Sequence, residues 1–286
     1  MTAVRVSPPR IFPAATRASK PPADAAGSAD AYRQASFTLG EDLSLVLVGL
    51  KLEGALADAA AGAKYRTQLT ASALLLWSRA WLNRLEALHA VEWGNYAAAF
   101  PLIRAAADCQ AAEVALLRSG AAEWQEWLDQ AGIGLAPEEH AEEYRLHAFR
   151  SGEVLATDPV LGPVYRMATD FSLSHFGASL LIAGSDSDPR RVVATFGDRD
   201  FHLGLAEIAL GWLLQLNVAQ METVAAYPAA FPSPPESAAS HSRAALAAAS
   251  RTDRCRVETI QRDEGQRYLV HNWRRVPGGA SRKVLL

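Results

Sequence analysis

Apolar residues recur at intervals of three and four along two neighbouring stretches of the chain, at about 65–93 and 96–118. This period is that of the α-helix, on which such residues share one face. Gly94 and Asn95 lie between the stretches and are typical of a helix end. We therefore expect two adjacent long helices around which the rest of the chain packs. Their apolar faces contain Leu74, Trp77, Trp81, Leu85 and Leu88 in the first and Tyr96, Phe100, Ile103, Val114 and Leu117 in the second.

The same period predicts further helices before and after this pair. We expect Asp200 to cap the last long one, because aspartate is a preferred N-cap residue. The fold class predicted from these segments is all-α, a bundle of about six helices. The additional segments lie at about 41–61, around 124–128, at 137–155, at 158–177 and at 200–226.

Two segments contain the short β-branched runs that are typical of strands. Over 179–197, SLLIAG and RRVVATF flank a polar SDSDP sequence, which predicts a small hairpin. Near the C-terminus, CRVETI and RYLVHNW flank an Asp-Glu-Gly turn and predict a second hairpin. The all-α class is therefore expected to carry minor β structure at these two places.

Composition divides the chain into four parts. Residues 1–28 are rich in Pro, Ala and Ser without hydrophobic periodicity, so we expect a disordered N-terminal segment. Residues 29–227 form the predicted helical bundle domain. A Pro/Ser/Ala-rich linker follows at 228–240, and 241–286 is a basic C-terminal extension.

Overall composition favours a cytoplasmic protein with a sizeable core. Half of the 286 residues are hydrophobic, and seven are tryptophan. The two cysteines, Cys109 and Cys255, have no neighbours at metal-ligand spacing, and they fit a reducing compartment better than a disulfide framework. No uncharged apolar run is long enough for a membrane span, and no secretory leader is recognisable.

Charge is unevenly distributed along the chain, although the formal net charge is only −3. Residues 251–286 contain eight Arg and one Lys against four acidic residues, and the first 23 residues contain four basic residues and no acid. A basic extension on an acidic body has two interpretations that the sequence leaves open. The extension is attracted to the body itself, or it makes a weak contact with RNA or an acidic partner.

The candidate chemistry centres on Arg104 and Asp108, which are four residues apart and so share a helix face. That face is lined by alanines beside the apolar stripe, so both charges are expected to be partly buried and to need partners. The candidate partners are Asp170, His175 and Glu207. The alternative is a structural ion pair that fixes the register of two helices.

The sequence around this pair also resembles a known group. Gly-Asn-Tyr-Ala-Ala-Ala-Phe-Pro-Leu-Ile-Arg-Ala-Ala-Ala-Asp (94–108), followed by Tyr165-Arg166 and Phe-Ser-Leu-Ser-His (171–175), is similar to uncharacterised bacterial all-helical proteins. Their architecture resembles the HEPN class of helical bundles, many of which belong to toxin–antitoxin and antiviral systems. The resemblance covers about 65–226. It implies that Arg104, Asp108 and His175 are the corresponding site residues, with Asp108 in place of the usual Glu and with Tyr96 as the tyrosine that precedes the signature and a further candidate binding residue.

Other literal motifs carry little information. Arg84 and His89 match the Arg-x4–6-His spacing of HEPN nucleases, but a chain with 24 Arg and seven His contains such pairs by chance. Glu86 and His89 match half of a di-iron site, which needs a second such motif. His140, Glu143 and His147 share one face of an acidic helix that is expected to be solvated. No phosphate-binding loop, dinucleotide motif, nucleophile elbow or Cys-x-x-Cys is present, so we expect no cofactor and no metal.

The sequence is compatible with two function classes, and it leaves open whether the protein is an enzyme. The first is a non-catalytic or regulatory HEPN-like bundle of the defence or toxin–antitoxin type that binds a protein, another copy of itself or RNA. The second is an enzyme or small-molecule-binding protein that uses Arg104, Asp108 and His175 in a cleft. Convergence of these three side chains on one pocket would favour the second class.

Overall fold

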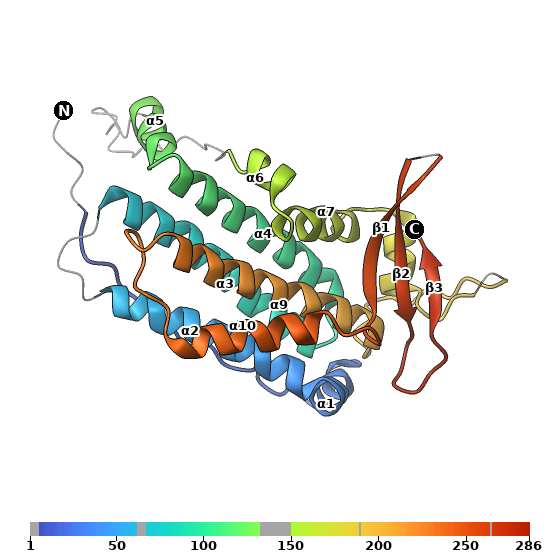
Figure 1. Ribbon diagram of the computed structural model, residues 1–286. Coiled ribbons are helices and arrows are strands. Elements are labelled where there is room, and N and C mark those ends of the chain that lie inside the picture. Colours follow the sequence, from blue (N-terminus) through green and yellow to red (C-terminus); the bar gives the residue numbers. More distant parts are fainter. Residues whose placement is uncertain (1–5, 62–66, 132–149, 189, 264) are drawn as a thin grey trace, which may run out of the picture.

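The computed structural model describes residues 6–61, 67–131, 150–188, 190–263 and 265–286. Within these ranges the chain forms ten helices and one three-stranded antiparallel sheet (Figure 1). The expected helical class is confirmed in the main, but about six helices is too few. The helices are α1 Ser28–Thr38, α2 Gly40–Ala61, α3 Gln68–Glu92, α4 Tyr96–Arg118, α5 Ala122–Ala131, α6 Gly152–Thr157, α7 Leu161–Ser172, α8 Phe176–Ala183, α9 Leu203–Ala226 and α10 Glu236–Ala249.

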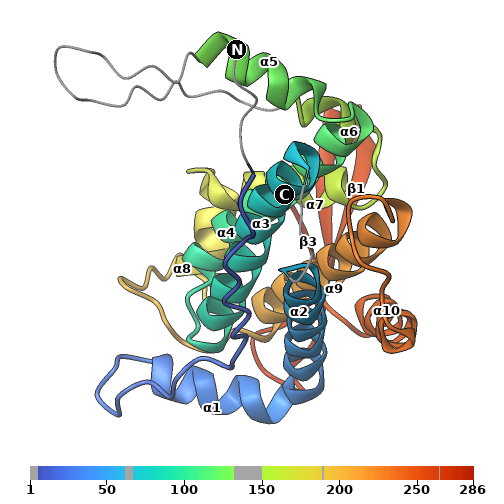
Figure 2. The same ribbon diagram turned by 90° about the vertical axis from the view of Figure 1, so that its left-hand side faces the viewer.

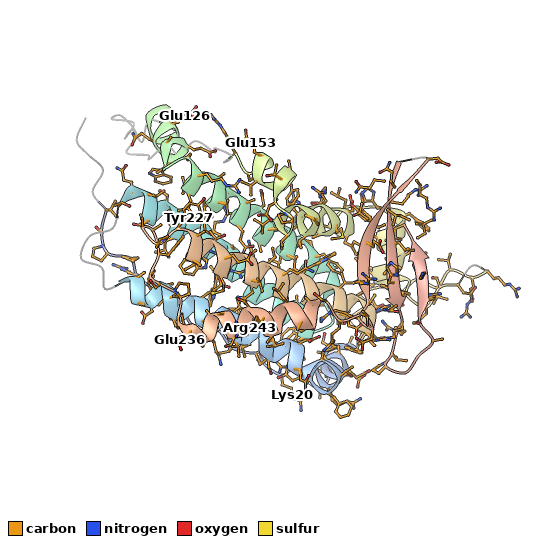
Figure 3. All side chains as sticks on the ribbon, viewed as in Figure 1. Lys20, Glu126, Glu153, Tyr227, Glu236 and Arg243 are labelled. Carbon is orange, nitrogen blue, oxygen red and sulfur yellow. The ribbon has the colours of Figure 1, made fainter. Side chains whose placement is uncertain are left out.

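The long helices α2, α3, α4 and α9 form the bundle, with α10 along α2 and α9 and with α7 against α4 (Figures 1 and 2). Helix α9 is buried on nearly all sides, as expected for a helix that is apolar all round. The largest core cluster includes Leu43, Leu88, Phe100 and Leu210, all fully or almost fully buried. Charged side chains such as Glu153 and Arg243 lie on the outside (Figure 3).

The predicted central helix pair is confirmed as α3 and α4. Helix α3 begins after Thr67, whose side chain accepts a hydrogen bond from the Thr70 backbone N–H. Gly94 lies in the turn between the two helices and has a left-handed backbone conformation, with φ 68°. A Cβ at this position would lie 2.2 Å from the Arg199 carbonyl oxygen, so the close approach also requires glycine. Helix α4 begins at Tyr96 and continues through Pro101.

The predicted hairpin over 179–197 is wrong. Residues 176–183 are helix α8, and the described part of the remainder has one isolated bridge, between Asp188 and Arg191. An apolar run as short as SLLIA suits a helix as well as a strand, and periodicity alone does not separate the two. Val192 and Phe196 are exposed, so a hairpin there would have no apolar face to bury.

Two predicted helix boundaries are also corrected. The helix expected over 158–177 is interrupted, because α7 ends at Ser172 and α8 begins only at Phe176. Asp200 does not cap α9. His202 is the N-cap residue, and its Nδ1 accepts a hydrogen bond from the Leu205 backbone N–H at 3.3 Å. Of the acidic helix expected over 137–155, residues 137–149 with His140, Glu143 and His147 lie outside the described residues, and its end overlaps α6.

The C-terminal hairpin is confirmed as β1 (Arg256–Arg262) and β2 (Gly265–Trp273), and β3 (Arg282–Leu285) extends it to a sheet in the order β1-β2-β3. One face packs on the bundle through Val270 and Trp273, both buried. Trp273 lies over the start of α9, where a Cβ on Gly204 would lie 3.0 Å from its ring. Most side chains on the opposite face are exposed to solvent, and Ile260, Leu269 and His271 there are half-buried.

The N-terminal strap, residues 6–27, contains no helix or strand, yet it is not detached from the bundle as the prediction of disorder implied. Ala15 and Ala18 are buried, and the Ala18 backbone N–H donates to Glu92 Oε2 at 2.8 Å. Figure 2 shows this segment, in dark blue, running beside α3. Composition did not reveal the docking because backbone groups of the strap make much of the contact.

The predicted linker over 228–240 is partly helical, since α10 begins at Glu236. Phe231 in the same segment is buried, with its ring edge-on to Trp77 at a centroid distance of 5.4 Å. In the part of the chain that the structure describes, no helix has the length and apolarity needed to cross a membrane.

Candidate functional site

Arg104 joins α4 to α7. Its Nε donates to Thr169 Oγ1 at 3.1 Å and its Nη2 donates to the Tyr165 hydroxyl at 3.2 Å, while the guanidinium lies 5.2 Å from the centre of the Tyr165 ring. These contacts combine hydrogen bonding with a cation–π interaction. They give Arg104 a role in packing the two helices together.

Asp108 contacts a different element. Its Oδ1 accepts a hydrogen bond from Ser151 Oγ at 2.8 Å, immediately before α6. Arg104 and Asp108, both in the described part of the chain, form no ion pair with each other. The shared helix face predicted from their spacing therefore holds two separate contacts to successive elements.

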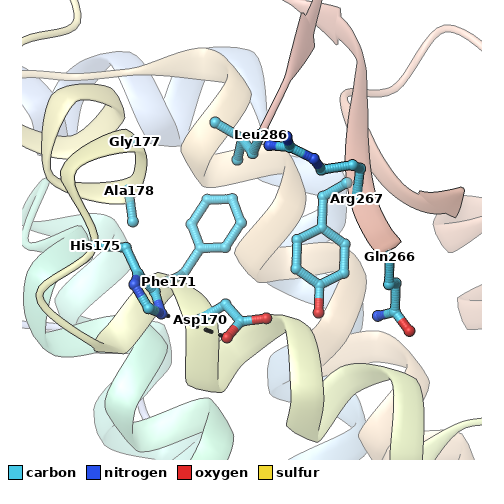
Figure 4. Close-up of a pocket in the computed structure, with 9 residues that line it drawn as sticks. Asp170, Phe171, His175, Gly177, Ala178, Gln266, Arg267 and Leu286 are labelled. Carbon is cyan, nitrogen blue, oxygen red and sulfur yellow. Dashed lines mark ion pairs between the residues drawn. The ribbon is translucent and has the colours of Figure 1, made fainter. Parts of the chain in front are cut away.

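Asp170 and His175 are the two predicted site residues that the structure does bring together. His175 Nε2 lies 3.7 Å from Asp170 Oδ1, and both side chains are partly exposed. The chain turns between α7 and α8, which places His175 back over the end of α7. They line a cavity of about 370 Å³ between these helices and β2, together with Tyr268, Gln266 and Arg267 (Figure 4).

Tyr268 connects this cavity to the C-terminal sheet. Burial and the neighbouring Asp170 carboxylate raise the pKa of Tyr268 to about 12, because a second negative charge beside Asp170 is unfavourable. The Tyr268 hydroxyl therefore stays protonated at neutral pH. Neither Arg104 nor Asp108 is among the described residues that line this cavity.

The two remaining candidates are Tyr96 and Glu207. Tyr96 contacts the residue that precedes α9, and Glu207 contacts the C-terminal extension. The Tyr96 hydroxyl accepts a hydrogen bond from the His202 backbone N–H at 3.0 Å, and burial raises its pKa far above the usual value. Glu207 Oε2 accepts from the Cys255 backbone N–H at 2.9 Å, and Oε1 lies 3.4 Å from Arg274 Nη2. Burial raises the pKa of Glu207. Both residues hold the fold together.

The strongest polar cluster inside the bundle was not among the predicted site residues. Arg84 Nη1 and Nη2 donate to the two carboxylate oxygens of Glu53, each at 2.6 Å, and both side chains are almost completely buried. Trp77 Nε1 and Asn217 Nδ2 complete the shell around Glu53 at 2.8 and 2.6 Å. His241 Nε2 lies 2.7 Å from Asn217 Oδ1. We call these five residues the interior ion cluster.

The sequence contained a signal for this cluster. Arg84 follows Trp77 and Trp81 at helical spacing, so it lies on the predicted apolar face of α3. Glu53 lies at the same spacing from Leu50 on α2. A charge on an apolar face requires a buried partner of opposite sign. Glu53 and Arg84 are each other's partner.

A second buried group lies beside the cluster. Gln220 Nε2 donates to Glu113 Oε1 at 3.2 Å, and Gln110 Nε2 donates to Gln220 Oε1 at 3.1 Å. Burial raises the pKa of Glu113 to about 8, and the negative charge of Glu53 acts in the same direction. Glu113 is therefore largely neutral at pH 7.

The literal nuclease spacing does not form a joint site. Arg84 is bound to Glu53 inside the bundle, whereas His89 Nε2 lies 2.9 Å from the Thr16 carbonyl oxygen of the strap. Among the described residues, no group of three His, Cys, Asp or Glu side chains is placed to hold a metal ion.

Seven of the nine Arg and Lys residues over 251–286 fall into two sets. Arg251 and Arg254 both approach Asp42 Oδ2, at 3.2 and 2.9 Å, and Arg275 Nη2 lies 3.5 Å from Asp200 Oδ2. With Arg274 on Glu207, these side chains bind the acidic body.

The second set lies on the solvent-exposed side of the sheet. The side chains of Arg256, Arg262 and Lys283 are exposed and, within the described residues, form no ion pair. The strand register places all three on the face opposite Val270, since side chains alternate between the two faces. We call these three residues the outer-face cations.

Comparisons with protein-family models, with curated proteins and with solved structures gave no match to this chain.

Proposed function

We propose that this protein is a non-catalytic, HEPN-like helical bundle that binds RNA through the outer face of its C-terminal sheet. The observation that carries the proposal is that some cations of the basic extension are paired with acids of the bundle, whereas others are exposed and unpaired within the described residues. Arg254 is bound inside the fold, whereas Arg256, two residues later, is exposed with no ion-pair partner in the described chain. Exposed cations on one face attract a polyanion such as a phosphate backbone.

Two further observations support a binding role without catalysis. Arg84 is bound to Glu53 inside the bundle and His89 contacts the strap, so this nuclease-type pair has no shared reaction centre. The alternative of an enzyme cleft needed Arg104, Asp108 and His175 at one pocket. Each of these three contacts a different partner, and only His175 lines the cavity beside β2.

The outer face also suits a sequence-tolerant contact. Ile260, Leu269 and Leu285 lie between the cations, and His271 Nε2 lies 2.6 Å from Glu258 Oε2, so that acid is already engaged. No Phe, Tyr or Trp side chain lies on this face of the described strands, so binding would depend on phosphates more than on stacked bases. Such binding is strongly weakened by salt.

The test compares two triple variants of the whole chain. The outer-face variant carries Arg256→Gln, Arg262→Gln and Lys283→Gln. The control variant carries Lys51→Gln, Arg79→Gln and Arg243→Gln, which removes three exposed cations from the bundle helices and gives the same net charge. Deleting residues 251–286 is a poorer test, because it also removes the buried Arg254 and Trp273.

Binding is measured by fluorescence anisotropy with a labelled single-stranded RNA of about 20 nucleotides, long enough for several phosphate contacts. We expect the outer-face variant to bind roughly tenfold or more weakly, and the control variant to bind like the wild type, because only direct phosphate contacts are lost. Equal weakening of both variants would contradict the proposed surface. If the protein bound polyglutamate tightly and did not bind RNA, the RNA proposal would be wrong, and the ligand of this face would be an acidic protein.

A further inference from the structure

A second, independent feature is an apolar cavity of about 450 Å³ between the N-terminal strap and helices α2 and α3. Its volume is in the range of small-molecule sites, and its walls are mainly hydrophobic and aromatic, as such sites are. The apolar lining residues include Pro9, Ile11, Phe12, Leu74, Trp77 and Trp81.

The strap forms the outer wall of this cavity and is anchored beyond it. Arg17 bonds to Glu92 and also donates to Ser36 Oγ at 2.9 Å. The Ser19 carbonyl oxygen accepts a hydrogen bond from Trp93 Nε1 at 2.9 Å. These bonds fix the strap at the end of α3, on one side of the cavity-lining segment 9–13.

Gly54 on α2 sets how closely the strap approaches the cavity. A Cβ at Gly54 would lie 2.8 Å from Pro13 Cβ, which is too close for real atoms. The absence of a side chain therefore lets Pro13 lie directly on the helix. Residues 9–13 line the cavity on the side of the strap.

Two charged residues line the cavity, and they differ in whether a ligand could pair with them. Glu53 lines the wall, but Arg84, Trp77 and Asn217 already bind its carboxylate. Arg10 is exposed, is the only cation among the described lining residues, and has no ion-pair partner within the described chain. The charge available to a ligand at this site is therefore positive.

The rim adds apolar surface that the protein leaves in water. Phe12 is 82% exposed, Leu75 is 59% exposed and Leu82 is 49% exposed, and all three line the cavity. Contiguous exposed apolar side chains around a pocket are typical of a binding site. A ligand that extended from the cavity to this rim would cover them.

We propose that this cavity binds a small amphipathic monoanion, whose apolar chain or ring lies against Trp77 and Trp81 and whose carboxylate pairs with Arg10. The apolar walls account for the body of the ligand and the unpartnered guanidinium for its head group. The site is separate from the sheet, so it does not depend on the RNA-binding proposal.

The probe is dodecanoate, used below its aggregation concentration, and dodecanol is the uncharged counterpart. Binding to the whole chain is followed by tryptophan fluorescence, since Trp77 and Trp81 line the cavity, and by calorimetry. We expect saturable dodecanoate binding, with hexanoate weaker because fewer methylene groups are buried. Arg10→Gln is expected to weaken dodecanoate binding about tenfold and to leave dodecanol binding unchanged.

Two more variants make the result decisive. Ser78→Trp places a bulky side chain at the exposed part of the lining and is expected to reduce binding of both probes. Arg79→Gln, also exposed on α3 but outside the lining, is the matched control and is expected to bind like the wild type. No saturable binding, equal binding by all variants, or dodecanol binding as tight as dodecanoate would each overturn the proposal.

Discussion

The interior of the bundle and the outer face of the C-terminal sheet use charge in opposite ways. Inside, Glu53 and Arg84 are almost completely buried and each is the other's partner. On the sheet, Arg256, Arg262 and Lys283 are exposed and form no ion pair with the described residues. Buried charges need partners for folding, whereas unpaired surface charges contribute little to stability. The contrast suggests that the interior ions maintain the structure and that the exterior ones are available to a ligand.

The largest effect is expected from breaking the interior ion cluster. Arg84→Ala leaves Glu53 buried without its cation, which costs about 3–5 kcal/mol of unfolding free energy. The control is Arg79→Ala on the same helix, where an exposed arginine is removed and the change should stay within roughly 0.5 kcal/mol. Urea denaturation followed by circular dichroism measures both. Similar stability of the two variants would show that the cluster is not structural.

The next effect compares two arginines that are two residues apart in the C-terminal extension. Arg254 Nη2 lies 2.9 Å from Asp42 Oδ2, and its Nε donates to the Glu207 carbonyl oxygen at 2.8 Å. Arg254→Ala should therefore cost about 3–4 kcal/mol, somewhat less than Arg84→Ala because Arg251 remains beside Asp42. Arg256→Ala should leave stability unchanged. A stability loss on Arg256→Ala would argue against a free outer face.

Glu113 gives the bundle interior a predictable pH dependence. Its pKa is about 8 in the fold, because of burial, and near 4.5 in the unfolded chain. The folded state therefore binds the proton more tightly, so this stabilisation is complete below about pH 4.5 and is lost as the pH rises towards 8. Between pH 5 and 8 the wild type should lose on the order of 3 kcal/mol relative to Glu113→Gln, which cannot ionise.

The measurement is a series of urea denaturations of both proteins across this pH range. Glu113→Gln is the suitable variant because its amide resembles the neutral acid in shape and still offers an oxygen to Gln220. Parallel stability curves for the wild type and the variant would show that Glu113 titrates normally.

A smaller effect is expected from crowding Asn217. A Cβ on Gly49 would lie 2.2 Å from Asn217 Oδ1, so Gly49→Ala must displace the side chain that bridges Glu53 and His241. We expect a loss of about 1–3 kcal/mol in thermal or urea unfolding. Gly40→Ala, in the same helix but with nothing within 4 Å, is the control and should not destabilise. A neutral Gly49→Ala would mean that Asn217 can move without loss.

The sequence predicted those parts of the fold that depend on local periodicity. Helices α3 and α4 follow from their apolar faces, and the β1–β2 hairpin follows from two strand-like runs around a turn. The segment 179–197 was predicted wrongly because its short apolar run has no period that separates helix from strand. The docking of the strap was missed because its hydrogen bonds involve backbone groups, which composition does not describe.

The sequence predicted contacts of the candidate site only between residues that are close together along the chain. Asp170 and His175 lie close together in sequence, and the turn between α7 and α8 brings them within 3.7 Å. The partners of Arg104, Asp108 and Glu207 are far away along the chain, and a single sequence contains no signal for those pairings. The cluster of Glu53 and Arg84 was recognisable in principle, since both interrupt an apolar helix face.

We propose that the outer-face cations of the sheet, rather than the interior charges, bind RNA. The most direct test is the salt dependence of RNA binding by the wild type and by the outer-face variant. Each phosphate contact contributes about −0.7 to the slope of log K against log salt for a single strand, so loss of three contacts should make the slope shallower by about 2. An unchanged slope in a stably folded outer-face variant, or RNA binding that does not depend on salt in the wild type, would contradict RNA binding by this face.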